Sequence, residues 1–156
     1  SNVTSMYGMF RGCNNLTSLD LSSFNTSNTD DMRFMFYECS NLLDLNLSSF
    51  NTKKVTSMSS MFGWCRTLYK ITLGKNFSFK GKSITDTSAQ AVLPTGEWTK
   101  SDNTVGPYTP EQFRDNYNSS MAGTWIGQYI ITYDANGGTR CSSITEKIIW
   151  SELDIK

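Results

Sequence analysis

The chain has 156 residues, with 14 basic and 14 acidic side chains, so its formal net charge is zero. Proteins that bind nucleic acid gather lysine and arginine on one surface, and this chain has no run of like charge, so we expect no nucleic-acid partner. Its apolar stretches are too short for a membrane-spanning helix or a signal-peptide core, so we expect no membrane insertion, and it contains no histidine, the commonest general base and metal ligand.

The first half of the chain contains three copies of one sequence repeat, with a period of 26 residues. We number the copies 1 to 3, and they span residues 1–26, 27–52 and 53–78. A period of this length is typical of proteins in which one supersecondary unit is stacked on its copies, so that each covers the apolar face of the next. In copy 1 the recurring apolar positions are Val3, Met6, Met9, Phe10, Cys13, Leu16, Leu19, Leu21 and Phe24.

Each copy has two halves that differ in the spacing of their apolar residues. In residues 3–13 these residues recur at steps of three and four, which predicts a short helix. In residues 16–22 apolar and polar residues alternate, which predicts a short half-buried strand. We therefore predict an α/β repeat solenoid, leucine-rich-repeat-like, with a short helix and a short strand in each copy and a face of parallel strands.

The full pattern is more specific than its strand motif Leu-x-x-Leu-x-Leu. With Val-Thr-Ser-Met-x-x-Met-Phe-x-x-Cys before that motif and Phe-Asn-Thr after it, it is similar to the BspA-like leucine-rich repeats of bacterial surface proteins, abundant in Mycoplasma, lactic acid bacteria and gut Firmicutes. The resemblance implies a repeat fold and a place on the cell surface of a Gram-positive or Mollicutes bacterium. Copy 3 slips by one residue after Leu73, so that Phe77 takes the position of Phe24 and Phe50. Because residue 1 already lies inside a repeat, we expect the chain to be a piece of a longer protein.

Cysteines and methionines occupy equivalent positions of the copies, so stacking would align them in columns. Zinc sites draw on close-spaced cysteine pairs, which are absent, and side chains that point the same way rarely reach disulfide geometry. A nucleophilic thiol needs a neighbouring base, and the pattern provides none. We therefore expect these side chains to fill the core, and the isolated Cys141 to be a free thiol. The columns are Cys13, Cys39 and Cys65; Met6, Met32 and Met58; and Met9, Met35 and Met61.

The outward positions of the predicted strands differ between copies, whereas the core positions hardly change. Variable side chains on a constant scaffold are typical of a recognition surface. The alternative is that these residues only keep the surface soluble, and the sequence leaves both interpretations open. The candidate partner-binding residues are Ser18, Asp20 and Ser22 in copy 1, Asp44, Asn46 and Ser48 in copy 2, and Lys70 and Thr72 in copy 3.

Residues 79–128 break the repeat pattern and are predicted to cap its last copy. Thr109 as N-cap, Pro110 in the first turn and Gln112 three residues on predict a helix over residues 110–117. The aromatic residues near it favour a domain that covers copy 3, although a sugar-binding cradle uses the same residue types. The segment is also similar to the one that commonly follows BspA-like repeats. Its aromatic residues are Trp98, Tyr108, Phe113, Tyr117 and Trp125.

Residues 129–156 are predicted to begin a second, β-rich module. A strand that begins at residue 129 is followed by Asn136-Gly137, which is a strong signal for a hairpin turn, and residues 144–150 are the candidate return strand. The run Tyr-Ile-Ile-Thr-Tyr-Asp-Ala-Asn-Gly-Gly-Thr resembles the opening of the Listeria–Bacteroides repeat, also called the internalin B-repeat. That resemblance implies the start of a truncated β-grasp-like module.

The sequence predicts a non-enzymatic bacterial cell-surface recognition or adhesion module, without cofactor or metal. It would bind a host, bacterial or matrix protein or a glycan through the strand face. The structural alternative is a spacer or scaffold with no ligand of its own. The enzyme alternative is glycan hydrolysis, which needs two carboxylates facing each other across a cleft. The carboxylates near the aromatic cluster, whose order suggests no such pair, are Glu97, Asp102, Glu111 and Asp115.

Overall fold

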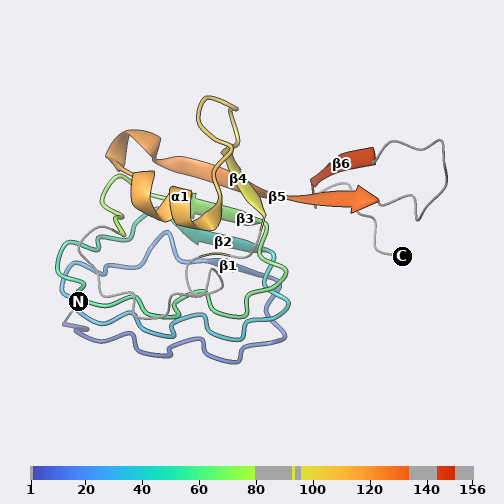
Figure 1. Cartoon of the computed structure of the whole chain (residues 1–156). Helices are drawn as coiled ribbons and strands as arrows, with labels where there is room; N and C mark the ends of the chain where they lie inside the picture. Colours follow the sequence, from blue (N-terminus) through green and yellow to red (C-terminus); the bar gives the residue numbers. More distant parts are fainter. Residues whose placement is uncertain (1, 80–92, 94–95, 134–143, 150–156) are drawn as a thin grey trace.

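The computed structural model describes residues 2–79, 93, 96–133 and 144–149, with side chains for the residues up to 128. The strands are β1 (Ser18–Asp20), β2 (Asp44–Leu47), β3 (Lys70–Leu73), β4 (Glu97–Lys100), β5 (Gly123–Tyr133) and β6 (Ile144–Ile149). They form one mixed sheet in the order β1-β2-β3-β5-β4, with β6 paired to the C-terminal part of β5 (Figure 1). β1, β2 and β3 run parallel, and every pairing of β5 is antiparallel. A helix, α1 (Pro110–Asn116), and a 3-10 turn (Ser119–Met121) precede β5.

The predicted α/β repeat solenoid, with one helix in each copy, is wrong. Across the described residues the only α-helix is α1, which follows the repeats, and the sheet is mixed rather than parallel throughout. The short strands predicted in the three copies are present as β1, β2 and β3, but residues 3–13 and their equivalents form successive turns. The copies therefore contribute strands to a mixed sheet and a turn-rich layer that faces it (Figure 1).

Left-handed backbone positions explain why the turn segments are not helices. Gly8 and Gly12 of copy 1 have φ values of 58° and 70°, and their equivalents in copy 2, Phe34 and Glu38, have values of 56° and 62°. A right-handed helix needs a negative φ at every residue, so a positive value at every fourth residue interrupts it. Successive four-residue turns also place apolar side chains three or four residues apart, which is the spacing that predicted a helical face.

Backbone hydrogen bonds join the copies along both of their halves. In copy 1 the N–H groups of Met6, Gly8, Phe10 and Gly12 donate to carbonyl oxygens of copy 2 over 2.9, 3.0, 2.9 and 2.8 Å. The equivalent groups of copy 2 donate to copy 3 in the same way. On the other side, β1 pairs with β2 and β2 with β3, each residue facing the one a repeat later. The 26-residue period of the sequence is therefore also the register of the structure.

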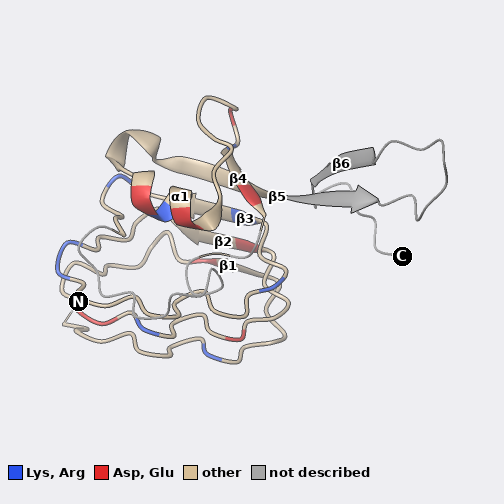
Figure 2. Ribbon diagram, in the orientation of Figure 1, with Lys and Arg blue, Asp and Glu red and all other residues tan. Residues whose placement is uncertain are grey.

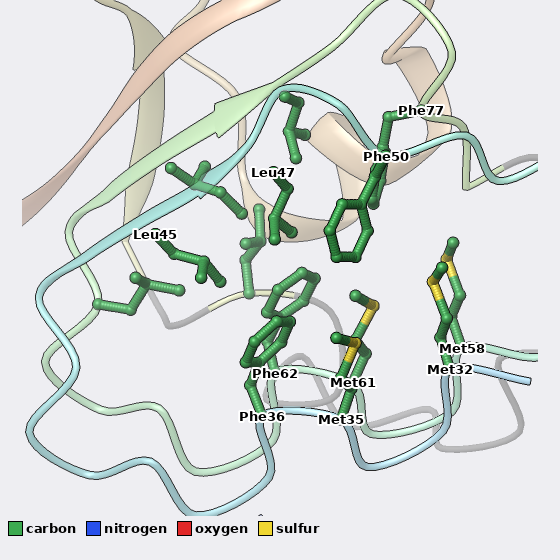
Figure 3. Packing of buried hydrophobic residues seen from close by; sticks show 14 of the residues in the cluster. Met32, Met35, Phe36, Leu45, Leu47, Phe50, Met58, Met61, Phe62 and Phe77 are labelled. Carbon is green, nitrogen blue, oxygen red and sulfur yellow. The ribbon is translucent and has the colours of Figure 1, made fainter. Parts of the chain in front are cut away.

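The core lies between the sheet and the turn-rich layer and is built from equivalent residues of successive copies (Figure 3). Phe36 stacks between Phe10 and Phe62, with its ring centroid 5.7 and 5.8 Å from theirs. Leu45 and Leu47, the inward residues of β2, are fully buried in the same space. Phe77 is buried after β3, as predicted from the one-residue slip in copy 3.

The thiol column lies in the core in copies 2 and 3. Cys39 and Cys65 are buried, and their Sγ atoms donate to the carbonyl oxygens of Phe10 and Phe36, each over 3.0 Å. Cys13 is only half-buried, and all three cysteines of the column are free thiols. The expectation of a buried column is confirmed for two of the three thiols, whereas Cys141 lies outside the described residues.

The methionine columns show the same difference between copy 1 and the others. Met35 and Met61 are buried, but Met9 is 50% exposed, so the expectation that this column fills the core is wrong for Met9. In the described structure copy 2 has neighbours on both sides, whereas copy 1 packs against copy 2 alone. The other methionine column is buried in all three copies.

Burial of Cys65 has a consequence for stability at alkaline pH. Removal of the thiol from water raises the pKa of Cys65 to about 12, whereas a thiol in an unfolded chain titrates near about 8.5. Above that pH the unfolded chain loses this proton and the folded protein keeps it, so we expect the stability to fall as the pH rises from about 9 toward 12. Urea unfolding at a series of pH values between 7 and about 10.5 measures the decline.

Cys65→Ala is the control for this decline, because it removes the thiol and leaves the other alkaline groups in place. We expect the variant to lose less stability than the unsubstituted protein over the same pH interval. Equal slopes in the two proteins would contradict the assignment of the effect to this buried thiol.

The aromatic residues after the repeats are packed into the core beside copy 3. Trp98, Phe113, Tyr117 and Trp125 are all buried, so their ring faces are not available to a sugar. The hydroxyl of Tyr117 donates to the carbonyl oxygen of Gly74 over 3.0 Å, and burial raises the pKa of this tyrosine. These contacts attach the segment to the last copy of the repeat.

The predicted helix is confirmed, because α1 covers Pro110–Asn116. Its N-terminus has the reciprocal bonds of a capping box: Thr109 Oγ1 accepts from the N–H of Gln112, and Gln112 Oε1 accepts from the N–H of Thr109. Each bond satisfies a backbone N–H that has no partner inside the helix. The cap thus fixes where the helix begins.

The two strands predicted around the Asn136-Gly137 turn signal are present as the C-terminal part of β5 and as β6. β6 runs antiparallel to β5, with residue 144 opposite residue 133 and residue 149 opposite residue 128. The predicted turn at Asn136-Gly137 lies outside the described residues. β5 runs without a break through residues 128 and 129, where the sequence analysis predicts a boundary between two modules. The domain boundaries given there remain predictions.

Candidate functional site

The outward side chains of the sheet form two rows that cross several strands. Parallel pairing sets Ser18, Asp44 and Lys70 side by side on β1, β2 and β3. The same register sets Asp20 beside Asn46, and Asn46 beside Thr72. Because side chains alternate along a strand, the residues between these positions point into the core. The repeat period therefore brings residues far apart in the sequence onto one polar surface.

These rows line a hollow of about 270 Å³. We call its residues the outer strand face. Six of the eight predicted site residues belong to it, whereas Ser22 and Ser48 do not line it. The face also includes Thr124 of β5, whose hydroxyl oxygen lies 2.9 Å from that of Thr72. The residues are Ser18, Asp20, Asp44, Asn46, Lys70, Thr72 and Thr124, together with Leu19, which is partly buried against the core.

Thr124 is the residue that the sequence analysis missed. It lies outside the repeats, and it reaches this surface because β5 pairs antiparallel with β3, which sets Thr124 opposite Thr72. Thr124, Trp125 and Ile126 are residue types favoured in strands, but no signal in the sequence indicates which strand would be their neighbour. The long-range pairing alone decides this position.

The charges of the outer strand face are one ion pair and one separate carboxylate. Lys70 Nζ lies 2.7 Å from Asp44 Oδ2, and this hydrogen bond raises the pKa of Lys70. Both partners are more than a third exposed, so the pair adds little stability. Asp20 accepts a hydrogen bond from the backbone N–H of Ser22 over 2.9 Å, which lowers the pKa of Asp20 and keeps its carboxylate ionised.

Charged residues elsewhere are spread over the described chain rather than gathered on one side (Figure 2). In the described residues no group of three or more histidine, cysteine or acidic side chains is placed to hold a metal ion. In the same part of the chain no helix has the length and apolar character to cross a bilayer. The chemistry of the outer strand face is thus that of exposed hydroxyl, amide, carboxylate and ammonium groups.

The carboxylates weighed for hydrolysis are distributed over different elements. Glu97 lies on β4, and Glu111 and Asp115 lie on α1, where Asp115 forms an ion pair with Arg114. Asp102 accepts hydrogen bonds from the side chain and backbone of Thr104, and these bonds lower the pKa of Asp102 to about 2. None of the four lines the hollow of the outer strand face.

The repeats match a known protein family. The family model that matches residues 1–87 is described as "Mycoplasma protein of unknown function, DUF285". No curated protein and no solved structure matches the chain. The matched residues contain all three copies of the repeat and the strands β1, β2 and β3.

Proposed function

For this chain, which belongs to the DUF285 family of Mycoplasma proteins of unknown function, we propose recognition of a protein or glycan partner through the outer strand face. The role proposed is adhesion or recognition without catalysis. The BspA-like resemblance of the repeats supports a place on the outer surface of a Gram-positive or Mollicutes cell. No cofactor or metal takes part in the proposed role.

The observation that carries the proposal is the gathering of polar side chains from four strands around one hollow. The inward residues that lie between them on the same strands, such as Leu45 and Ile71, are apolar in every copy, and these two are fully buried. The outward residues change from copy to copy, from Asp20 to Asn46 to Thr72. A surface that varies on a framework that does not vary is suited to recognition.

The charges of the face indicate what the partner presents. Asp20 has an ionised carboxylate that accepts hydrogen bonds from Ser22, and its remaining lone pairs can accept from a basic or hydrogen-bond-donating group of the partner. Asp44 and Lys70 already neutralise each other, and they offer their remaining hydrogen-bonding positions to the same partner. We therefore expect contacts made by hydrogen bonds and charge, with few apolar ones.

Charge reversal on the outer strand face tests this proposal. We expect Asp20→Lys with Asp44→Lys to weaken binding at least tenfold on an array of glycans and matrix proteins probed with the protein. The two side chains lie on the surface, so the melting temperature should change by only about 1–2 °C. The control is Glu38→Lys with Asp30→Lys, which makes the same change of charge at exposed residues of the turn-rich layer and should leave binding intact.

Binding that survives the reversal at Asp20 and Asp44 would place the contact elsewhere on the molecule. Failure of the unsubstituted protein to bind any member of the array would favour the spacer alternative. In that case deletion of one whole repeat should be tolerated, because a spacer needs only its length and its stacking.

A further inference from the structure

A second hollow, of about 390 Å³, adjoins the hollow of the outer strand face, and Lys70 of β3 lines both. From Lys70 the second hollow extends over β5 and β4, because Lys70 faces Ile126 of β5, and Ile126 faces Thr99 of β4. The two hollows together therefore follow the sheet from β1 to β4. The second hollow is lined mainly by Tyr69, Lys70, Thr99, Lys100, Ile126 and Gln128.

The two hollows differ in the chemistry of their walls. The exposed wall of the first hollow is mainly polar, whereas that of the second is mainly apolar. Tyr69 and Ile126, both half-buried, are the large apolar side chains that line the second hollow. A large apolar side chain that fills such a hollow is a typical anchor of a protein interface, because its burial removes apolar surface from water.

The charges also differ between the two hollows. At the β1 end, Asp20 forms no ion pair with another described residue, and its carboxylate keeps lone pairs for a further donor. In the middle, Lys70 Nζ lies 2.7 Å from Asp44 Oδ2. In the second hollow, Lys100 Nζ lies 3.1 Å from Asp102 Oδ2. The first hollow therefore has one negative charge without a counter-charge, whereas the ammonium groups at the second are already paired.

From these observations we propose that the partner is a protein, and that an extended segment of it crosses the strands with a basic side chain at Asp20 and a large apolar side chain at Ile126. This choice of partner class rests on the recognition function proposed for the outer strand face. The strand order β1-β2-β3-β5 puts three strand spacings between the two contacts, which is about 14 Å at about 4.8 Å for each spacing. An extended chain covers this distance in about four residues, and side chains four residues apart point to the same side.

A protein segment matches these two contacts better than a glycan does. Arginine and lysine supply the cation that Asp20 can accept, and tryptophan, phenylalanine and leucine supply the apolar group. Most sugar units carry hydroxyl groups on nearly every carbon and no positive charge, so they match neither contact as well. β2, β3 and β5 are paired on both sides, so the segment is held by its side chains and adds no strand between them.

Selection of random dodecapeptides displayed on phage, with the unsubstituted protein as the target, tests the partner class. We expect the enriched peptides to share arginine or lysine and, four positions away, tryptophan, phenylalanine or leucine. Synthetic peptides of the enriched sequences should bind about tenfold more weakly to Asp20→Lys and to Ile126→Thr, which loses apolar surface but stays β-branched. The control is Val3→Thr, which changes an exposed apolar side chain that lines neither hollow and should leave binding unchanged.

NMR of the unsubstituted protein with an enriched peptide tests the apolar contact even if Ile126→Thr folds poorly. The methyl signals of Ile126 should shift in a saturable way. If they stay in place while Asp20→Lys weakens binding, the apolar contact is wrong and the proposed recognition stands. Enrichment of no peptide would overturn the protein partner, and a glycan whose binding is lost with Asp20→Lys and Asp44→Lys would still support the recognition. Peptides that bind this double variant unchanged would overturn both.

Discussion

Gly74→Ala is expected to destabilise the protein by about 3 kcal/mol or more, the cost of forcing atoms into a packed interior. Gly74 follows β3, and a Cβ atom on it would overlap the backbone carbonyl oxygen of Ser48, with the carbonyl carbon at 2.8 Å. Backbone atoms cannot move aside as a side chain can, so copies 2 and 3 would have to separate. The carbonyl of Gly74 also accepts the buried hydroxyl of Tyr117, and that bond would be strained by the same shift. Urea unfolding gives the difference in free energy.

Gly12→Ala is the matched control for this change. Gly12 has a φ of 70°, and a Cβ atom there would meet no atom within 4 Å. Only the left-handed backbone disfavours alanine, at a cost of about 1–2 kcal/mol. If Gly74→Ala costs no more than Gly12→Ala, then the two copies are not as close at this point as the structure has them.

Phe36→Ala is expected to cost about 3–5 kcal/mol, the usual range for removing a buried aromatic side chain. Its ring is fully buried between Phe10 and Phe62, so truncation leaves a cavity and removes two stacking contacts. Such a loss is a large part of the stability of a typical domain. Thermal and urea unfolding measure it, and the variant should still bind any partner of the outer strand face while folded.

Phe10→Ala is the comparison within the same column. Phe10 occupies the equivalent position of copy 1 but is only partly buried. We expect its truncation to cost about 1–2 kcal/mol, because less apolar surface returns to water. Equal costs at Phe10 and Phe36 would show that burial does not differ between the copies as described.

Several features follow from the sequence because they depend on residues close together in the chain. Alternation in residues 16–22 predicts β1, and the same motif one and two periods later predicts β2 and β3. Thr109, Pro110 and Gln112 predict where α1 begins, since a helix cap involves only its own first turn. The period also predicts which outward residues meet, so six of the eight candidates line one hollow.

The helical assignment of residues 3–13 failed because spacing alone does not distinguish a helix from a series of turns. Glycine at positions 8 and 12 is compatible with a left-handed backbone in copy 1. Copies 2 and 3 carry no such signal, because their equivalent positions hold Phe34, Glu38, Ser60 and Trp64. These residues adopt positive φ although it is unfavourable for them. The bonds that compensate come from the neighbouring copy, so the preference of the isolated segment does not decide its conformation.

The sequence by itself determined the repeat, its strands and its inward and outward residues, because local spacing and a fixed period carry that information. Only the tertiary structure decided that the copies form turns rather than helices, that the sheet is mixed, and that Thr124, Thr99 and Gln128 stand beside residues of copy 3. The reason is the same in each case. These features arise from hydrogen bonds between separate segments of the chain, and no pattern within one segment specifies its partner.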